Sequence, residues 1–226
     1  MSTRFSILYE DNHLLIVNKP NGVLSQGDHT KDKTVVDFGK SYIKEKYNKP
    51  GDVYLHPVTR IDRPVSGAII LARTSKALTR MTTIVRDREI QKRYVALVDG
   101  VPELGEVNLT DYLVKDSKKN KVSVVPKGST GAKKADLTYQ MLSYIGKEAA
   151  LSINLHTGRP HQIRVQLANQ GLNIVGDGKY GYRSTTDHDY IYLHCLSLAF
   201  VHPVKKTKVK VKAPLPQLPL WSKVGV

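Results

Sequence analysis

The chain has 226 residues, enough for one large domain or two small ones, and its 40% hydrophobic and 24% charged content is ordinary for a globular protein. Its charge balance is unusual, because 35 Lys and Arg residues oppose 20 Asp and Glu residues and give a formal net charge of +15. So basic a chain favours polyanions, of which nucleic acid is the commonest. Binding to anionic lipid would call for a basic amphipathic helix or a lipidation signal, and neither is found in the sequence.

Cysteine content and the N-terminus indicate a compartment. One cysteine, Cys195, excludes an intramolecular disulfide and fits a reducing environment. Charges at Arg4, Glu10 and Asp11 interrupt any signal core, and no apolar run approaches the ~20 residues of a membrane helix. We therefore expect a cytoplasmic protein without a membrane partner.

The first hundred residues predict strands with two helices between them. Apolar runs bounded by turn residues predict strands on both sides of Asp11-Asn12, at 67–72 and at 91–100, with a turn at 19–22. A weak helix is expected over 35–47. Thr74 or Ser75 can cap a second helix, which carries apolar residues at helical spacing.

The second half predicts more strands than helices. Residues 115–134, rich in Lys, Gly and Ser, are expected to be a mobile connection. Pro160 suits the first turn of a helix closed by Gly171. Alternating apolar residues predict strands at 150–158, 191–203 and 208–214. Because strands and helices do not alternate as βαβ units would, the predicted fold class is α+β, with a mixed, mostly antiparallel sheet in a single domain over residues 1–226.

Several motifs resemble known binding sites, but the residues around them or their spacing argue against such a site. The GDGKYG stretch at 176–181 matches G-x-G-x-x-G, but loop residues follow it where a dinucleotide site needs a helix, so a glycine-rich turn is expected. The residues His188, His194, Cys195 and His202 match no common zinc spacing, and Cys195 is expected in the core. No metal site is predicted.

The stretch VTRIDRPVSG at 58–67 places a single carboxylate, Asp62, between Arg60 and Arg63. Such a carboxylate is either an ordinary surface ion-pair residue or a reactive acid that its neighbours keep ionised. Two other stretches stand out beside it, QKRYVALVDG at 91–100 and HTGRPHQIRV at 156–165.

Together with NKPNG at 18–22, GDGKYG and LHCLSLAFVHP at 193–203, these stretches resemble RluA-type pseudouridine synthases over residues 7–214. The resemblance implies a pseudouridine synthase fold in which helices flank the sheet around a central RNA-binding cleft. It also implies isomerisation of a uridine in structured RNA, tRNA or rRNA, to pseudouridine, without a cofactor or metal.

By the motif match, Asp62 corresponds to the essential aspartate, Tyr94 to the tyrosine that stacks on the target base, and Arg164 to the arginine that pairs with the aspartate. An ionised carboxylate could attack the sugar or the base, or remove the C2′ proton, and these alternatives stay open. A guanidinium close to a carboxylate favours its ionised form. Base stacking on an aromatic ring contributes ~1–3 kcal/mol, and the tyrosine hydroxyl could pass a proton at C5.

Four further residues are RNA-binding candidates. The resemblance suggests that Arg60 enters the RNA where the uridine swings out. Arg63, Arg159 and His161 lie beside the motifs and are expected to contact phosphates, as are the backbone N–H groups of a helix that starts at Pro160.

The sequence also departs from the family pattern. Thr59 stands where His is common, Pro64-Val65 replaces Asp-Thr, and Pro160 and Gln166 replace Thr and His. The motifs begin within the first ~20 residues, so we expect RNA binding by the catalytic domain without a preceding S4-like domain. A monomer is expected, because no heptad pattern calls for a partner. The main alternative is a non-catalytic RNA-binding protein with the same fold; a nucleotide-dependent enzyme would have only GDGKYG in its favour.

Overall fold

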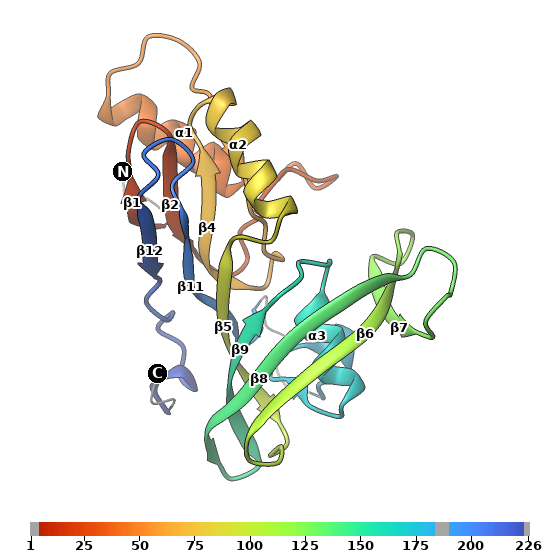
Figure 1. The fold of residues 1–226 in the computed structure, drawn as a ribbon. Coiled ribbons are helices and arrows are strands. Elements are labelled where there is room, and N and C mark those ends of the chain that lie inside the picture. The colour runs from red at the N-terminus through yellow and green to blue at the C-terminus, as the bar shows by residue number, and fades with distance from the viewer. Residues whose placement is uncertain (1–4, 184–189, 224–226) are drawn as a thin grey trace. The chain divides into compact units, whose positions relative to one another are not determined.

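The computed structural model describes residues 5–183 and 190–223, which form two compact units (Figure 1). Unit 1 comprises Met1–Gln91 and Cys195–Pro216, and unit 2 comprises Lys92–His194 and Gln217–Val226. The chain enters unit 2 at the start of strand β5 and returns to unit 1 within strand β11.

Unit 1 is built on a sheet in the order β1-β2-β4-β11, where β3 adds to β4 and β12 adds to β11. The pairs β1–β2, β2–β4, β3–β4 and β11–β12 are antiparallel. Gly67 allows a close approach, because a Cβ atom there would lie 2.4 Å from the backbone N and O of Cys195. The strands are β1 (Ser6–Glu10), β2 (Leu14–Lys19), β3 (His56–Pro57), β4 (Ser66–Ala72), β11 (Leu193–Val201) and β12 (Lys208–Lys212).

Two helices in unit 1 begin where polar caps precede apolar runs. Helix α1 (Val35–Lys46) has a capping box between Thr34 and Asp37, and helix α2 (Ser75–Arg86) is capped by Thr74. Helix α1 buries its apolar face against β2 and β4 in a cluster of Phe5, Leu15, Val17, Val35, Ile43, Leu55, Ile69 and Leu71. This packing fixes the two segments that leave β2 and enter β4.

Unit 2 is built on an antiparallel sheet in the order β5-β9-β8-β6-β7, and β10 pairs with β5. Helix α3 (Gln162–Asn169) packs against it, and its Val165 shares a buried cluster with Tyr180 and with β6, β7 and β8. The strands are β5 (Gln91–Asp99), β6 (Glu106–Asp116), β7 (Lys121–Val125), β8 (Lys133–Ile145), β9 (Glu148–Leu155) and β10 (Asn173–Ile174); two 3-10 turns, η1 (Gly178–Tyr180) and η2 (Trp221–Lys223), follow.

The predicted α+β class with a mostly antiparallel sheet is confirmed, as are the predicted strands, both helices of unit 1 and the Gly171 stop of α3. The prediction of a mobile connection over 115–134 is wrong. Much of that range lies in strands β6, β7 and β8, because Val122 is buried under Tyr180 and β7 pairs with β6. Lysines on the exposed positions concealed this pattern in the sequence.

Three remaining expectations concern metal sites, membrane-spanning helices and the number of domains. Of the proposed metal-ligand candidates, His188 lies outside the described residues; the described ones contain no group of three or more His, Cys, Asp or Glu that could hold a metal. In the described part of the chain, no helix is long and apolar enough to cross a membrane. The chain divides into two compact units, and whether these form the single domain expected over residues 1–226 stays a prediction.

Candidate active site

Asp62 lies in the segment that leads into β4, and a second segment, which follows β2, holds it from one side. Val58 and Thr59 bond to Ile70 of β4, which fixes the start of the segment. The N–H of Val65 donates to the carbonyl of Asp62 at 3.1 Å and closes a turn. Asp62 itself is partly exposed.

Ser25 fixes the residue before Asp62. Its hydroxyl donates to the carbonyl of Ile61 at 2.7 Å and accepts the N–H of Ile61 at 3.1 Å. Ser25 is 5% exposed, so this reciprocal pair is shielded from water.

The two residues after Asp62 are held by the turn at 19–22. The N–H of Gly22 donates to the carbonyl of Arg63 at 2.9 Å, and the Arg63 Nε returns a bond to the carbonyl of Gly22 at 3.0 Å. Asn21 Nδ2 donates to the carbonyl of Pro64 at 2.8 Å. The backbone on both sides of Asp62 is therefore fixed by one neighbouring segment.

The flanking arginines have partners of their own. Arg60 Nη1 donates to Gln26 Oε1 at 3.2 Å, and Arg63 Nη1 lies 2.9 Å from Asp32 Oδ2 with both side chains about half exposed. Both arginines are exposed at the surface, where RNA could reach them.

Lys19 is a charged group of this site that the sequence did not reveal. It is fully buried at the end of β2, and its Nζ donates to the carbonyls of Pro20, Val23 and Arg63 at 2.9, 2.7 and 3.2 Å. Burial lowers the pKa of Lys19 to about 7, the Asp62 carboxylate opposes this shift, and Arg63 adds to it. Three carbonyls match the three N–H donors of the ammonium form. Lys19 therefore lies in the field of Asp62, and its ammonium form is a buried cation there.

Arg164 lies on α3 in unit 2 and is buried, with 5% exposure. Its Nε and Nη2 donate to Oδ2 and Oδ1 of Asp177 at 2.7 and 2.8 Å, a bidentate geometry that fixes the guanidinium plane. Asp177 is 1% exposed. A buried arginine that is bound in this way is held in one orientation and is not a solvated surface charge.

Tyr180 supports the same arginine from a second direction. The Arg164 guanidinium lies over the Tyr180 ring, 5.1 Å from its centroid. The Tyr180 hydroxyl accepts the N–H of Val122 at 2.9 Å and lies 2.8 Å from Nδ1 of His161. His161, a predicted RNA-binding residue, is therefore joined to Arg164 through one aromatic ring.

The start of α3 differs from the prediction. The helix begins at Gln162, not at Pro160, because His161 takes a left-handed conformation with φ of 49°. Gln162 Oε1 accepts the Thr157 hydroxyl and the N–H of Arg159, which fixes the turn before the helix. The predicted helix start at Pro160 is therefore wrong by two residues, and the expected contact between the N–H groups of this helix start and a phosphate stays a prediction.

The remaining predicted residues of unit 2 are Arg159 and Tyr94. Arg159 is partly exposed, and its Nε donates to the carbonyl of Lys134 at 3.0 Å. Tyr94 lies on β5 opposite Ile153 of β9 and is 7% exposed. Unit 1 thus carries Asp62, Arg60 and Arg63, and unit 2 carries Tyr94, Arg159, His161 and Arg164.

Sequence reasoning missed Lys19 and Asp177, although both lie in quoted motifs. Lys19 ends a strand whose other residues are mostly buried, and Asp177 stands in GDGKYG. The glycine spacing of GDGKYG predicted a turn, which is confirmed, but it gave no indication that the carboxylate of Asp177 binds Arg164.

Comparisons with known proteins, by sequence and by structure, both indicate the family that the sequence motifs resemble. A sequence profile described as RNA pseudouridylate synthase matches residues 13–169. Ribosomal large subunit pseudouridine synthase C of Buchnera aphidicola subsp. Schizaphis graminum is 33% identical over 217 residues, which cover 93% of this chain and 67% of the relative. Ribosomal large subunit pseudouridine synthase D of Zymomonas mobilis is 32% identical over 223 residues, which cover 93% and 69%.

Two solved structures share the fold. Human RNA Pseudouridylate Synthase Domain Containing 4 aligns with a TM-score of 0.79 at 23% identity, covering 94% of this chain and 89% of that one. Human RNA Pseudouridylate Synthase Domain Containing 1 aligns with a TM-score of 0.73 at 25% identity, covering 97% and 87%.

Proposed function

Because the chain belongs to the RNA pseudouridylate synthase family and is an RNA pseudouridine synthase, we propose that Asp62, Tyr94 and Arg164 act together on one uridine of large-subunit ribosomal RNA. The reaction breaks the bond between N1 and C1′, forms a bond between C5 and C1′, and transfers a proton from C5 to N1. No atom is gained or lost, so the protein must supply charge, orientation and a route for one proton.

The construction of the Asp62 segment is the observation that carries this proposal. Buried hydrogen bonds fix the residues before and after Asp62, and a buried lysine lies within its field. Burying a lysine is costly unless it is paired or bonded. RNA binding alone gives no reason to maintain a carboxylate in this way beside Arg60 and Arg63. Asp62 therefore supplies the ionised carboxylate of the reaction.

Tyr94 and Arg164 complete the site in this proposal. The ring of Tyr94 supports the uracil once its glycosidic bond has opened, a contact worth ~1–3 kcal/mol. The guanidinium of Arg164, which Asp177 holds in one orientation, supplies positive charge to the reaction. Asp177 and Tyr180 are positioning residues, because they act through Arg164.

The RNA approaches through cationic side chains. Arg60 fills the space that the uridine leaves, and Arg63, Arg159 and His161 contact phosphates, in keeping with a net charge of +15. Large-subunit ribosomal RNA is favoured over tRNA because the similar proteins of Buchnera aphidicola and Zymomonas mobilis carry that substrate in their names. We place the protein in the cytoplasm as a monomer.

Tritium release from C5-labelled uridine tests the reaction, the substrate class and the carboxylate together. Labelled large-subunit ribosomal RNA transcripts and bulk tRNA transcripts are each incubated with the wild type, with Asp62→Asn and with the control Asp52→Asn, an exposed loop aspartate in unit 1. We expect release from the ribosomal transcript with the wild type and Asp52→Asn, and loss of at least about 100-fold with Asp62→Asn.

Each arm can contradict a different part of the proposal. Release from tRNA in place of the ribosomal transcript would overturn the substrate class. Full release with Asp62→Asn would overturn the role of the carboxylate. RNA binding by Asp62→Asn should stay within a few fold of the wild type, since the substitution changes charge without changing shape.

A further inference from the structure

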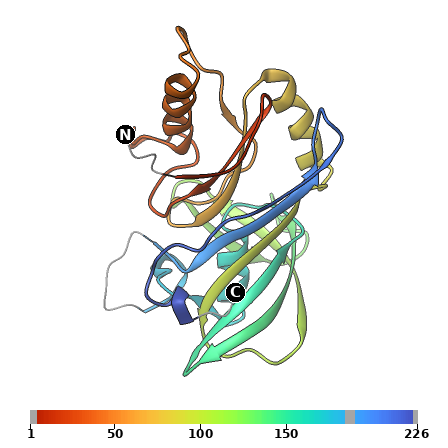
Figure 2. The same cartoon turned by 90° about the vertical axis from the view of Figure 1, so that its left-hand side faces the viewer.

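One end of the unit 2 sheet exposes apolar side chains that no neighbouring element covers completely. Tyr144 is 62% exposed and Ile145 is 49% exposed at the turn between β8 and β9. Leu104, in the connection from β5 to β6, is 86% exposed. Figures 1 and 2 both place this connection and the β8–β9 turn at the same end of unit 2. Exposed apolar side chains at one end of a sheet are candidates for an interaction site.

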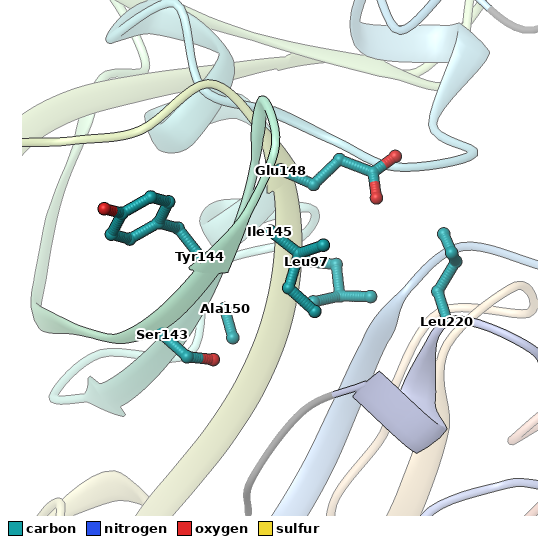
Figure 3. Close-up of a pocket in the computed structure, with 7 residues that line it drawn as sticks. All are labelled: Leu97, Ser143, Tyr144, Ile145, Glu148, Ala150 and Leu220. Atoms are coloured by element: carbon teal, nitrogen blue, oxygen red, sulfur yellow. The ribbon is translucent and has the colours of Figure 1, made fainter.

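A groove opens between this turn and the C-terminal segment. Figure 3 shows Ile145 and Leu97 facing Leu220 across it, with Glu148 at its edge. Its enclosed volume is only about 10 Å3, far below the ~300–1,000 Å3 of typical small-molecule sites. The groove is therefore a shallow apolar surface that a larger partner could cover, and it cannot enclose a small-molecule ligand. The lining residues are Leu97, Ser143, Tyr144, Ile145, Glu148, Ala150 and Leu220.

The two segments that form this end of unit 2 carry a charge of opposite sign to that of the whole chain. Residues 97–106 and 140–150 carry four carboxylates and one ammonium, a net formal charge of −3 in a chain of +15. The ammonium of Lys147 lies 3.3 Å from Asp99, so it is already paired. The carboxylates are Asp99, Glu103, Glu106 and Glu148.

The negative field reaches a nearby phenol. Burial raises the pKa of Tyr182, and the charges of Glu148 and Asp99 raise it further, whereas Lys147 opposes them. The carboxylates therefore outweigh the one lysine at this end of the sheet.

We propose that this surface docks a lysine- or arginine-rich protein segment, which lays one aliphatic or aromatic side chain against the apolar surface between Ile145 and Leu220. The carboxylates at this end of unit 2 attract such a segment and repel the phosphates of RNA. Proteins that bind the same RNA are themselves basic, because they must neutralise phosphates. The enzyme can thus contact RNA through its cationic surfaces and a basic RNA-bound protein through this end of unit 2. The inference does not depend on which residues catalyse the reaction.

A peptide titration of the full-length protein tests the proposal. The 15N-labelled chain is titrated with the peptide KKFLKK and with two controls, EEFLEE and KKSSKK, while amide shifts are recorded. We expect KKFLKK to shift amides of residues 97–106 and 142–150 and to bind at least about tenfold more tightly than either control, since charge and the apolar side chain both contribute. Added salt should weaken this binding.

Matched variants separate docking from folding. Ile145→Ser removes an exposed wall of the groove and should weaken KKFLKK binding at least about tenfold, whereas Ile7→Ser, at an exposed isoleucine of β1, should leave it unchanged. Both variants should keep wild-type tritium release, which distinguishes this proposal from the one for Asp62.

Four outcomes would overturn the docking proposal. They are failure of KKFLKK to bind, equal binding of EEFLEE, shifts confined to other residues, or shifts at residues 142–150 caused by a single-stranded RNA oligonucleotide. Sedimentation of the free protein is a fifth check, because a dimer that Ile145→Ser dissociates would assign the groove to a second copy of the chain.

Discussion

The segment around Asp62 in unit 1 and the helix that carries Arg164 in unit 2 hold their functional groups in different ways. Around Asp62, the bonds in the structure hold the backbone of its neighbours, through Ser25, the turn at 19–22 and Lys19. Arg164 is held by its own side chain, through a bidentate bond to Asp177 and the ring of Tyr180.

This difference follows from what each group must do in the proposed reaction. A carboxylate that takes part in bond making needs a fixed position but also access to the RNA, so its support comes through the main chain. A guanidinium that supplies charge can be buried completely, provided that a counter-ion accompanies it. The two arrangements therefore predict different responses to substitution.

The largest expected effect is the loss of the Arg164 counter-ion. Asp177→Asn removes the buried carboxylate that binds the Arg164 guanidinium in a bidentate geometry and should reduce the free energy of unfolding by about 3–5 kcal/mol. Tritium release should fall as well, because the guanidinium loses its fixed plane. Denaturant titration gives the first quantity. Asp116→Asn, at an exposed turn carboxylate of the same unit, should stay within about 0.5 kcal/mol of wild type, and equal stability of the two variants would contradict the account.

The next effect concerns Lys19 and depends on pH. The pKa of Lys19 is about 7 in the folded chain and 10.5 when the lysine is free of the fold, so between these pH values the unfolded chain binds more protons than the folded chain. The free energy of unfolding of the wild type, compared with that of Lys19→Met, should therefore rise by a few kcal/mol as the pH increases from 7 to about 10. Below pH 7 the difference should be constant.

Chemical unfolding of both proteins across this pH range measures the difference directly. Lys40→Met, at an exposed lysine of α1, is the matched control and should follow the wild type at every pH. If the difference in free energy of unfolding between the wild type and Lys19→Met did not change with pH, burial would not lower the pKa of this lysine.

A smaller effect is expected at Ser25. Ser25→Ala removes both bonds to Ile61 and should cost about 1–3 kcal/mol, and tritium release should fall more than RNA affinity because the residue before Asp62 is loosened. Ser41→Ala, at an exposed serine of α1 whose hydroxyl donates to the backbone carbonyl of Asp37, provides the control. Equal rates for the two alanine variants would show that Ser25 does not position the catalytic segment.

Much of the fold was predictable because its signals are local. Thr74 and Gly171 mark helix ends by their own chemistry, and β12 alternates exposed lysines with buried valines. Strand β7 was not predictable, because its position depends on pairing with β6 and on Tyr180, which is 58 residues away from Val122. Local composition favoured a loop there.

The candidate site likewise contains residues that the sequence predicted and residues that only the structure revealed. Asp62, Tyr94 and Arg164 were predicted as site residues because their motifs occur in a specific order along the chain. Lys19 and Asp177 were missed, because a buried charge can be recognised only when its acceptors or its partner are known. The carbonyl of Arg63 lies 44 residues from Lys19 and the guanidinium of Arg164 lies 13 residues from Asp177, so neither pair follows a helix or strand spacing that the sequence would reveal.

The most direct test of the central claim, that Asp62 of unit 1 and Arg164 of unit 2 act on the same uridine, is a double-mutant cycle of single-turnover tritium release. Wild type, Asp62→Asn, Arg164→Lys and the double variant are compared on the ribosomal transcript. If the two groups act as one unit, the double variant should release tritium no more slowly than the slower single variant. Losses that multiply across the two substitutions would mean that Asp62 and Arg164 contribute independently, and the proposed pairing would be wrong.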